Sequence, residues 1–94
     1  MASFTTRVEL HKEQPSDYET LHTEMGKIGF SRLITSDDGV SYRLPAAEYN
    51  LSGNFSRAEV LEKAKGAVKA TGREASILVT ESSGRTWSNL TKVS

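Results

Sequence analysis

Two histidines, His11 and His22, are the side chains of this sequence that exchange protons near neutral pH. A histidine that activates a nucleophile normally works with a serine or cysteine and is oriented by an acidic residue. The chain has no cysteine, and neither histidine has a serine or an acid at a spacing that identifies such a triad. Each histidine is therefore more typical of a surface residue. His22, which follows Leu21 on an expected helix, is the better candidate for chemistry.

A pair of neighbouring carboxylates, Asp37 and Asp38, could bind a divalent cation. Magnesium and calcium require several converging oxygen ligands, and the spaced acids of an EF-hand-type loop do not follow this pair. Asp38-Gly39 is instead typical of a tight hairpin turn, because both residues tolerate positive φ angles. We interpret the pair as a turn and expect neither a metal site nor another cofactor.

A group of cations marks the region of the second expected helix. Its members are Arg57, Lys63, Lys65, Lys69 and Arg73. Glu59 and Glu62 stand at helical spacing from two of these lysines, so an ordinary solvated face is the simpler interpretation. The alternative is a track for an RNA backbone or a partner, to which Lys69 and Arg73 would contribute.

Arg85 and Trp87, near the end of the chain, form a second candidate contact. A lone tryptophan beside an arginine could stack on an RNA base. Packing of the same ring across a dimer interface requires fewer assumptions.

Composition limits the class of protein. A chain of 94 residues makes one domain, residues 1–94, and a domain of this size often gains burial by pairing with a copy of itself. Twelve basic residues balance twelve acidic ones, so we expect weak non-specific binding to nucleic acid and no binding to DNA. The N-terminus does not resemble a signal peptide, and no segment reaches the roughly 20 apolar residues of a membrane span. We expect a cytoplasmic protein, outside the membrane, that forms a homodimer.

Period-2 and period-3.6 patterns predict the order β-α-β-β-α-β. The expected strands are residues 4–11, 30–36, 48–52 and 75–80, with a short arm at 40–44, and the expected helices are residues 16–28 and 56–71. A Ser-x-x-Glu capping box begins each helix, at Ser16/Glu19 and at Ser56/Glu59. Residues 85–90 also have strand propensity, and we expect them to pair with a sheet edge of this chain or of a partner.

Right-handed crossovers would place both helices on one face of a four-stranded antiparallel sheet. The sequence thus predicts an α+β, ferredoxin-like sandwich with a core at about residues 3–81 and a tail at 82–94. The opposite face of the sheet would be mostly polar. An RNA-recognition motif of the same topology needs aromatic residues on that face, and the pattern provides none.

A set of turn and core residues resembles the GhoS family over residues 4 to 70. The matching residues are Tyr18, Leu21, Met25, Phe30-Ser31, Ile34, Asp38-Gly39, Leu44-Pro45 and Tyr49. Members of that family are small ferredoxin-like proteins, related to the CRISPR-associated adaptation ribonucleases. They act as antitoxins of type V toxin–antitoxin systems by cutting the messenger RNA of the toxin.

The resemblance implies an RNA-directed protein and an endoribonuclease. The simplest scheme needs no metal: His22 or His11 accepts the proton of a 2′-hydroxyl, and Arg7 or Arg32 stabilises the charge on the phosphate. The alternative is a non-catalytic, homodimeric interaction or regulatory module. The composition and the strand edges that this topology leaves available support this alternative.

Overall fold

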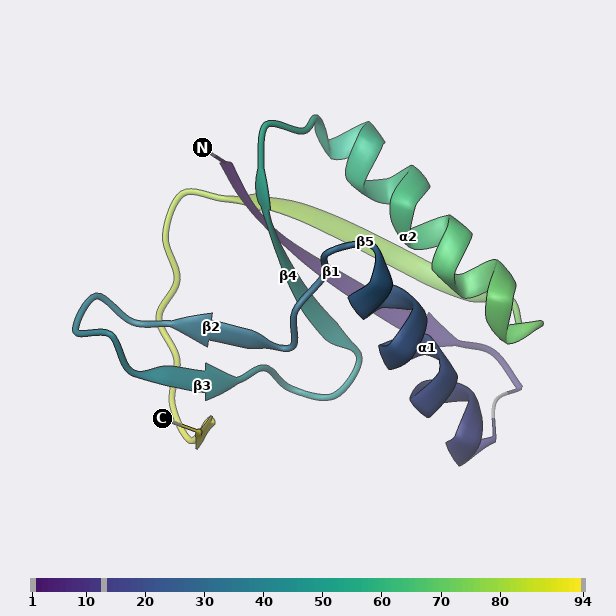
Figure 1. Cartoon of the computed structure of the whole chain (residues 1–94), viewed down its shortest axis with the longest axis horizontal. Coiled ribbons are helices and arrows are strands. Elements are labelled where there is room, and N and C mark those ends of the chain that lie inside the picture. Colours follow the sequence, from purple (N-terminus) through teal and green to yellow (C-terminus); the bar gives the residue numbers. More distant parts are fainter. Residues whose placement is uncertain (1, 13, 94) are drawn as a thin grey trace.

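The N-terminal strand forms the centre of the main sheet. A computed structural model describes residues 2–12 and 14–93. Its elements are β1 (Ala2–Leu10), α1 (Pro15–Lys27), β2 (Leu33–Thr35), β3 (Ser41–Arg43), β4 (Glu48–Gly53), α2 (Arg57–Thr71), β5 (Ala75–Ser82) and β6 (Thr91–Lys92). β1 pairs antiparallel with β4 on one side and with β5 on the other, so the strand order is β4-β1-β5 (Figure 1).

β1 has one buried and one exposed face, as its alternating pattern predicts. Phe4, Val8 and Leu10 belong to the hydrophobic core, whereas Arg7 and Glu9 are exposed. Thr6 is also fully buried and lies in the middle of the inward row. The inward row of β1 is thus apolar except for one hydroxyl group.

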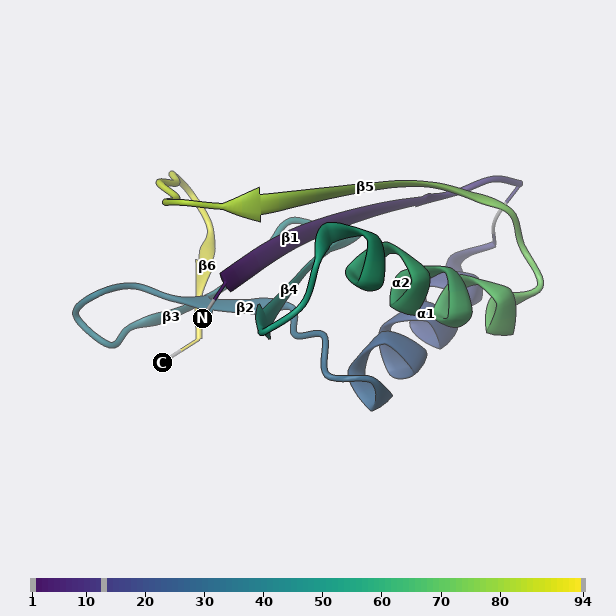
Figure 2. The same cartoon turned by 90° about the horizontal axis from the view of Figure 1, so that it is seen from above.

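Both helices cover this inner face, and Figure 2 shows them on the same side of the sheet. The buried residues that they contribute are Leu21 and Met25 of α1 and Val60, Ala64, Ala67 and Val68 of α2. These residues pack with the inward row of β1 and with Tyr49 and Leu51 of β4 in one cluster. The period-3.6 patterns of both helices therefore contribute to the core, whereas Ile28, at the end of the first expected helix, is exposed.

The two helices begin differently from each other. The predicted capping box of α2 is confirmed: Glu59 N donates to Ser56 Oγ, and Ser56 N donates to Glu59 Oε1. The predicted box at Ser16/Glu19 is wrong, because α1 already begins at Pro15 and Gln14 N donates to Asp17 Oδ2. Proline is favoured at the first helical position, where its fixed φ suits the helix and no N–H is needed.

The predicted four-stranded sheet is replaced by two antiparallel sheets of three strands each. Among the described residues, the segment after α1 pairs with the backbone of the main sheet through one bridge, in which Ser31 and Asn50 exchange two hydrogen bonds of 2.8 and 2.6 Å. β2 then leaves the main sheet and pairs with β3 in a hairpin. This departure buries Ile34 and Leu44, which line a hollow together with Trp87 of the tail.

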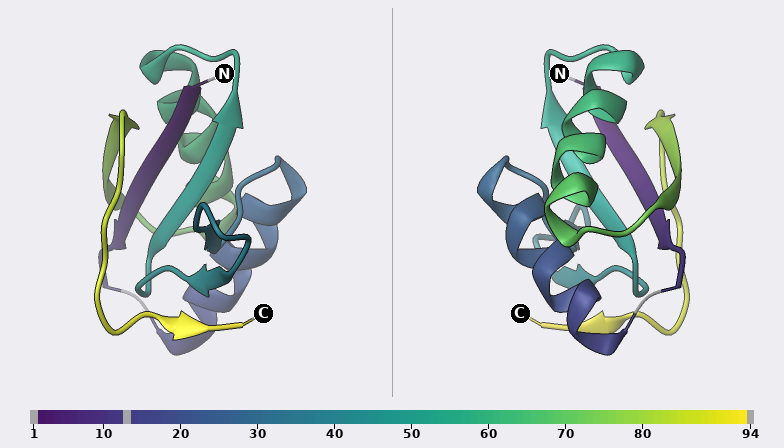
Figure 3. Two further views of the ribbon diagram at one scale, coloured as in Figure 1. Left: turned by 90° about the vertical axis from the view of Figure 1, so that its left-hand side faces the viewer. Right: turned by 90° about the vertical axis from the view of Figure 1, so that its right-hand side faces the viewer.

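The C-terminal tail pairs with an edge of its own chain, but not through the expected residues 85–90. β6 pairs with β3, with Tyr42 opposite Lys92, and Val93 N donates to Ser41 O. In Figure 3 the tail, coloured yellow, runs from the end of β5 to β6 beside the β2–β3 hairpin. Residues 85–90 serve as an irregular connection across the outer face of the main sheet.

Neither helix in the described part of the chain combines the length and apolar character that a membrane crossing requires.

The buried hydroxyl of Thr6 gives a test of this core. Thr6 Oγ1 has no hydrogen-bond partner among the described residues, and a buried polar atom without a partner lowers stability. We expect Thr6→Val, which keeps the side-chain shape, to raise the free energy of unfolding by about 1 kcal/mol in urea titrations. Thr6→Ala is the control and should lower it, because a methyl group is lost from the core. A less stable valine variant would show that the hydroxyl has a partner.

Candidate functional site

A hollow of about 420 Å³ opens beside the C-terminal half of β1, next to α1. Its polar lining consists of Arg7, Glu9, Tyr18 and His22, and the loop before β4 closes one side with Ala46 and Ala47. Two of the four residues predicted for chemistry, Arg7 and His22, therefore meet at one hollow, although they are on different elements.

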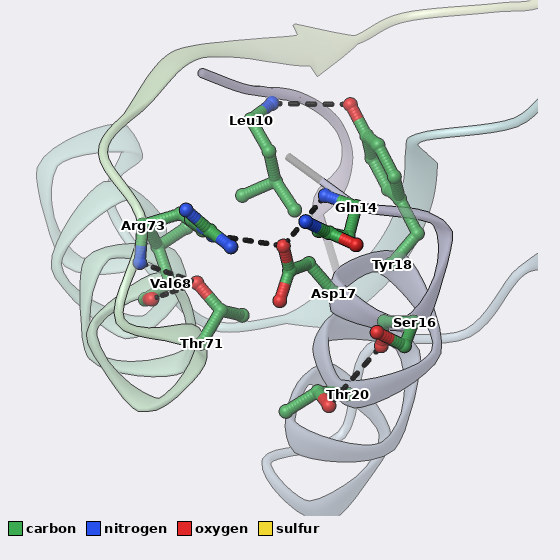
Figure 4. A network of polar contacts seen from close by, with 9 residues as sticks. All are labelled: Leu10, Gln14, Ser16, Asp17, Tyr18, Thr20, Val68, Thr71 and Arg73. Atoms are coloured by element: carbon green, nitrogen blue, oxygen red, sulfur yellow. Dashed lines mark hydrogen bonds and ion pairs between the residues drawn. The ribbon is translucent and has the colours of Figure 1, made fainter. Parts of the chain in front are cut away.

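The hollow exists because β1 is longer than β4. The register ends with Arg7 opposite Glu48, so residues 8–10 of β1 have no strand partner on that side. Val8 N donates to Ala47 O at 2.9 Å, and Leu10 N donates to the Tyr18 hydroxyl at 3.1 Å. Figure 4 shows Tyr18 reaching from α1 to Leu10. A loop and a side chain from α1 thus take the place of a strand and form the wall of the hollow.

His22 is held by two tyrosine rings. Its Nδ1 lies 2.6 Å from the hydroxyl oxygen of Tyr49, a core residue that is only 1% exposed. The Tyr18 ring lies 6.4 Å from the His22 ring, measured between centroids. Tyr49 in turn packs edge-on against Phe30. The imidazole is therefore fixed at the boundary between the core and the hollow.

The surroundings of His22 favour its neutral form. Burial lowers the pKa of His22 below 6.5, the positive charge of Arg32 lowers it further, and Glu19 opposes the shift. Burial also raises the pKa of Tyr49 to about 12. At neutral pH the pair consists of a neutral imidazole and a protonated phenol. When Nδ1 donates to the Tyr49 oxygen, Nε2 carries the lone pair that a general base requires.

Arg32 contributes charge to this group of residues. It precedes β2, and its carbonyl oxygen accepts from Leu44 N at 2.7 Å. Its Nε is buried and has no hydrogen-bond partner among the described residues. The guanidinium acts electrostatically on both His22 and Tyr49. It therefore lies near the predicted base but does not line the hollow.

His11 lies apart from this group. Its exposed side chain makes a hydrogen bond of 2.9 Å between Nε2 and the Ser76 hydroxyl of β5. It does not line the hollow. The two predicted histidines are thus not brought together.

Two of the four predicted contact residues, Arg73 and Arg85, make polar interactions within the chain. Arg73 Nε donates to Asp17 Oδ2 at 2.8 Å (Figure 4) and thereby connects the start of β5 to α1. The Gln14 N–H, with help from Arg73, lowers the pKa of Asp17 below its usual value. Arg85 donates to Thr5 Oγ1 and to Asn50 Oδ1, both at 2.8 Å from Nη2.

The other two contact residues lie on different surfaces. The Trp87 ring packs against the Tyr42 ring, with 5.4 Å between centroids. Lys69 is exposed and lines a groove between α2 and β5. These four residues therefore do not form one continuous contact surface with the hollow.

Tyr18 and Tyr49 were not predicted as site residues. In the sequence they belong to the turn and core residues that resemble the GhoS family, and the position of an aromatic residue in such a pattern does not show where its hydroxyl group lies. Glu9 is a further residue of the hollow that the sequence does not predict, because the alternating pattern indicates only that it is exposed. Within residues 2–12 and 14–93, no three histidine, cysteine or acidic side chains come together in a possible metal site.

Comparison with known proteins does not place the chain in a family: neither the known family models nor the curated proteins include a match.

The environment of His22 is open to direct measurement. We expect a histidine NMR titration to give His22 a pKa below 6.5, because burial and Arg32 both disfavour the imidazolium. Arg32→Gln should raise this pKa, since it removes a nearby positive charge. Arg43→Gln, which changes an exposed arginine of β3, is the matched control and should leave it unchanged. A His22 pKa above 6.5 would contradict the arrangement described here.

Proposed function

We propose that this chain is an RNA-directed protein of GhoS-like type that cleaves single-stranded RNA at the hollow beside β1. One observation carries the proposal: a half-buried histidine, His22, is oriented by a buried tyrosine and shares a hollow with an arginine, Arg7. A base and a cation at one opening are the two groups that cleavage by a neighbouring 2′-hydroxyl requires.

The architecture supports a ferredoxin-like fold for this protein. The central order β4-β1-β5 agrees with that fold, and so do the two helices on one face. The bridge between Ser31 and Asn50 lies where the fourth strand of such a sheet would begin. The resemblance to the GhoS family would then extend from the sequence pattern to the arrangement of the elements, and would suggest the messenger RNA of a toxin as the substrate.

The proposed reaction is an in-line transfer within the RNA. His22 Nε2 accepts the proton of the 2′-hydroxyl, and the 2′-oxygen attacks the adjacent phosphorus. The bond from phosphorus to the 5′-oxygen breaks, and that oxygen takes up a proton from water or from the imidazolium. The products are a 2′,3′-cyclic phosphate and a 5′-hydroxyl end. Arg7 stabilises the negative charge on the phosphate, and Tyr49 positions His22.

A second candidate function is a non-catalytic homodimeric interaction module. The observation that favours it is the second edge of β5, an eight-residue strand that pairs only with β1 within residues 2–12 and 14–93. In that case the hollow would have no role in RNA chemistry.

Cleavage by the purified full-length protein tests the first proposal. The substrates are end-labelled single-stranded RNAs in EDTA, in magnesium, and with single 2′-deoxy substitutions. We expect cleavage to leave cyclic phosphate ends and to stop at deoxy positions. His22→Gln should slow it about 10²- to 10⁴-fold, and Arg7→Gln about 10²- to 10³-fold. His11→Gln is the matched comparison and should cleave at nearly the wild-type rate.

Three results would contradict the proposal. They are intact RNA with the wild-type protein, cleavage at deoxy positions, and a His22→Gln variant as active as the wild type. Circular dichroism of each variant verifies that the fold is retained. Intact RNA together with a stable dimer would favour the interaction module.

A further inference from the structure

The outer edge of β5 is unusually open for an edge strand. β5 spans eight residues, Ala75–Ser82, and pairs with β1 along its inner edge. No strand within residues 2–12 and 14–93 pairs with its other edge. In Figure 2, β5 runs along the upper margin of the molecule, and the tail leaves it at its end. A row of backbone N–H and C=O groups is thus available to another strand.

The side chains of β5 do not protect this edge. Proteins usually prevent pairing of edge strands with lysine, proline, a bulge or a very short strand. β5 contains no lysine or proline, its register with β1 is continuous, and it is eight residues long. Glu81, near its end, is its one charged residue. Leu78, near its centre, is 64% exposed on the outer face of the sheet. The strand therefore has the features of a pairing surface.

We propose that β5 pairs antiparallel with β5 of a second copy of this chain, about a two-fold axis at Leu78. Such an axis pairs residues that lie equally far before and after position 78, one from each copy. Leu78 therefore faces Leu78 of the second copy, and Ala75 faces its Glu81. The two exposed leucines cover each other on the outer face. The main sheet of one copy, β4-β1-β5, joins the main sheet of the other copy in one continuous sheet of six strands.

The charges at the two ends of β5 fit this arrangement. At the Ala75 end, a groove of about 460 Å³ lies between α2 and β5, and Lys65, Lys69 and Arg73 line it. At the other end, Glu81 lies on the same face as the helices, because its Oε1 is 4.0 Å from Arg57 Nε of α2. Antiparallel pairing therefore brings Glu81 of each copy to the basic groove of the other.

The opposite charges at the two ends of β5 favour a second copy of this chain over an unrelated strand. A two-fold axis forms the contact between Glu81 and the basic groove twice, whereas a parallel arrangement would place like ends together. The inference does not rest on RNA cleavage. The hollow near His22 lies on the β4 side of β1 and stays open in the dimer, so the two proposals can fail separately.

Sedimentation equilibrium of the full-length chain tests this interface. We expect a wild-type dimer at micromolar concentration. Leu78→Lys should weaken it at least tenfold, because two like charges would face each other at the axis. Leu33→Lys is the matched control and should not change it, since that leucine is exposed on β2. Glu81→Lys should weaken the dimer, and the double variant Glu81→Lys/Lys69→Glu should restore it.

The results that would overturn the inference are equally direct. A wild-type monomer at several hundred micromolar would exclude the dimer and leave the edge to another partner. Equal weakening by Leu78→Lys and Leu33→Lys would place the interface elsewhere. If the double variant is folded by circular dichroism but its dimer stays as weak as that of Glu81→Lys, the antiparallel alignment is contradicted.

Discussion

The two-sided pairing of β1 is the interaction on which the rest of the structure depends. Its inward residues, from Phe4 to Leu10, form the floor on which both helices pack. On its outward face, the Thr5 hydroxyl accepts a hydrogen bond from Arg85 of the tail. Since β1 continues beyond β4, its last residues find their partners in Ala47 and in Tyr18. The candidate site is a direct result of this difference in strand length.

The polar residues of the site belong to the boundary of the core and not to an exposed loop. Tyr49 is a core side chain whose hydroxyl emerges beside His22. Burial acts on both groups and keeps the imidazole neutral and the phenol protonated. The same packing that stabilises the fold therefore sets the protonation state of the proposed base, and no separate element is needed to position it.

The sequence predicts the main elements well and their connections poorly. The alternation of β1, the Ser56 cap of α2 and the apolar stripes are local patterns, and the structure confirms them. The start of α1 follows from Pro15, a local signal that competes with the Ser16/Glu19 pattern. The departure of β2 from the main sheet brings Ile34 to a hollow that the tail also lines, and no local pattern shows this long-range arrangement. The sequence predicts His22 and Arg7 as site residues, but the hollow that they share depends on strand register. The role of Tyr49 as the partner of His22 depends on where its hydroxyl group leaves the core.

The position of β1 in the sheet also has a consequence for the order of folding. Ser3 pairs with Ser82 and Leu10 pairs with Ala75, so the first strand of the main sheet along the chain pairs with the last strand of that sheet. Contacts between such distant parts of a chain are slow to form. The helices and β4, which cover or pair with β1, all precede β5 in the chain. During synthesis, one edge of the central strand therefore stays unpaired until β5 has left the ribosome.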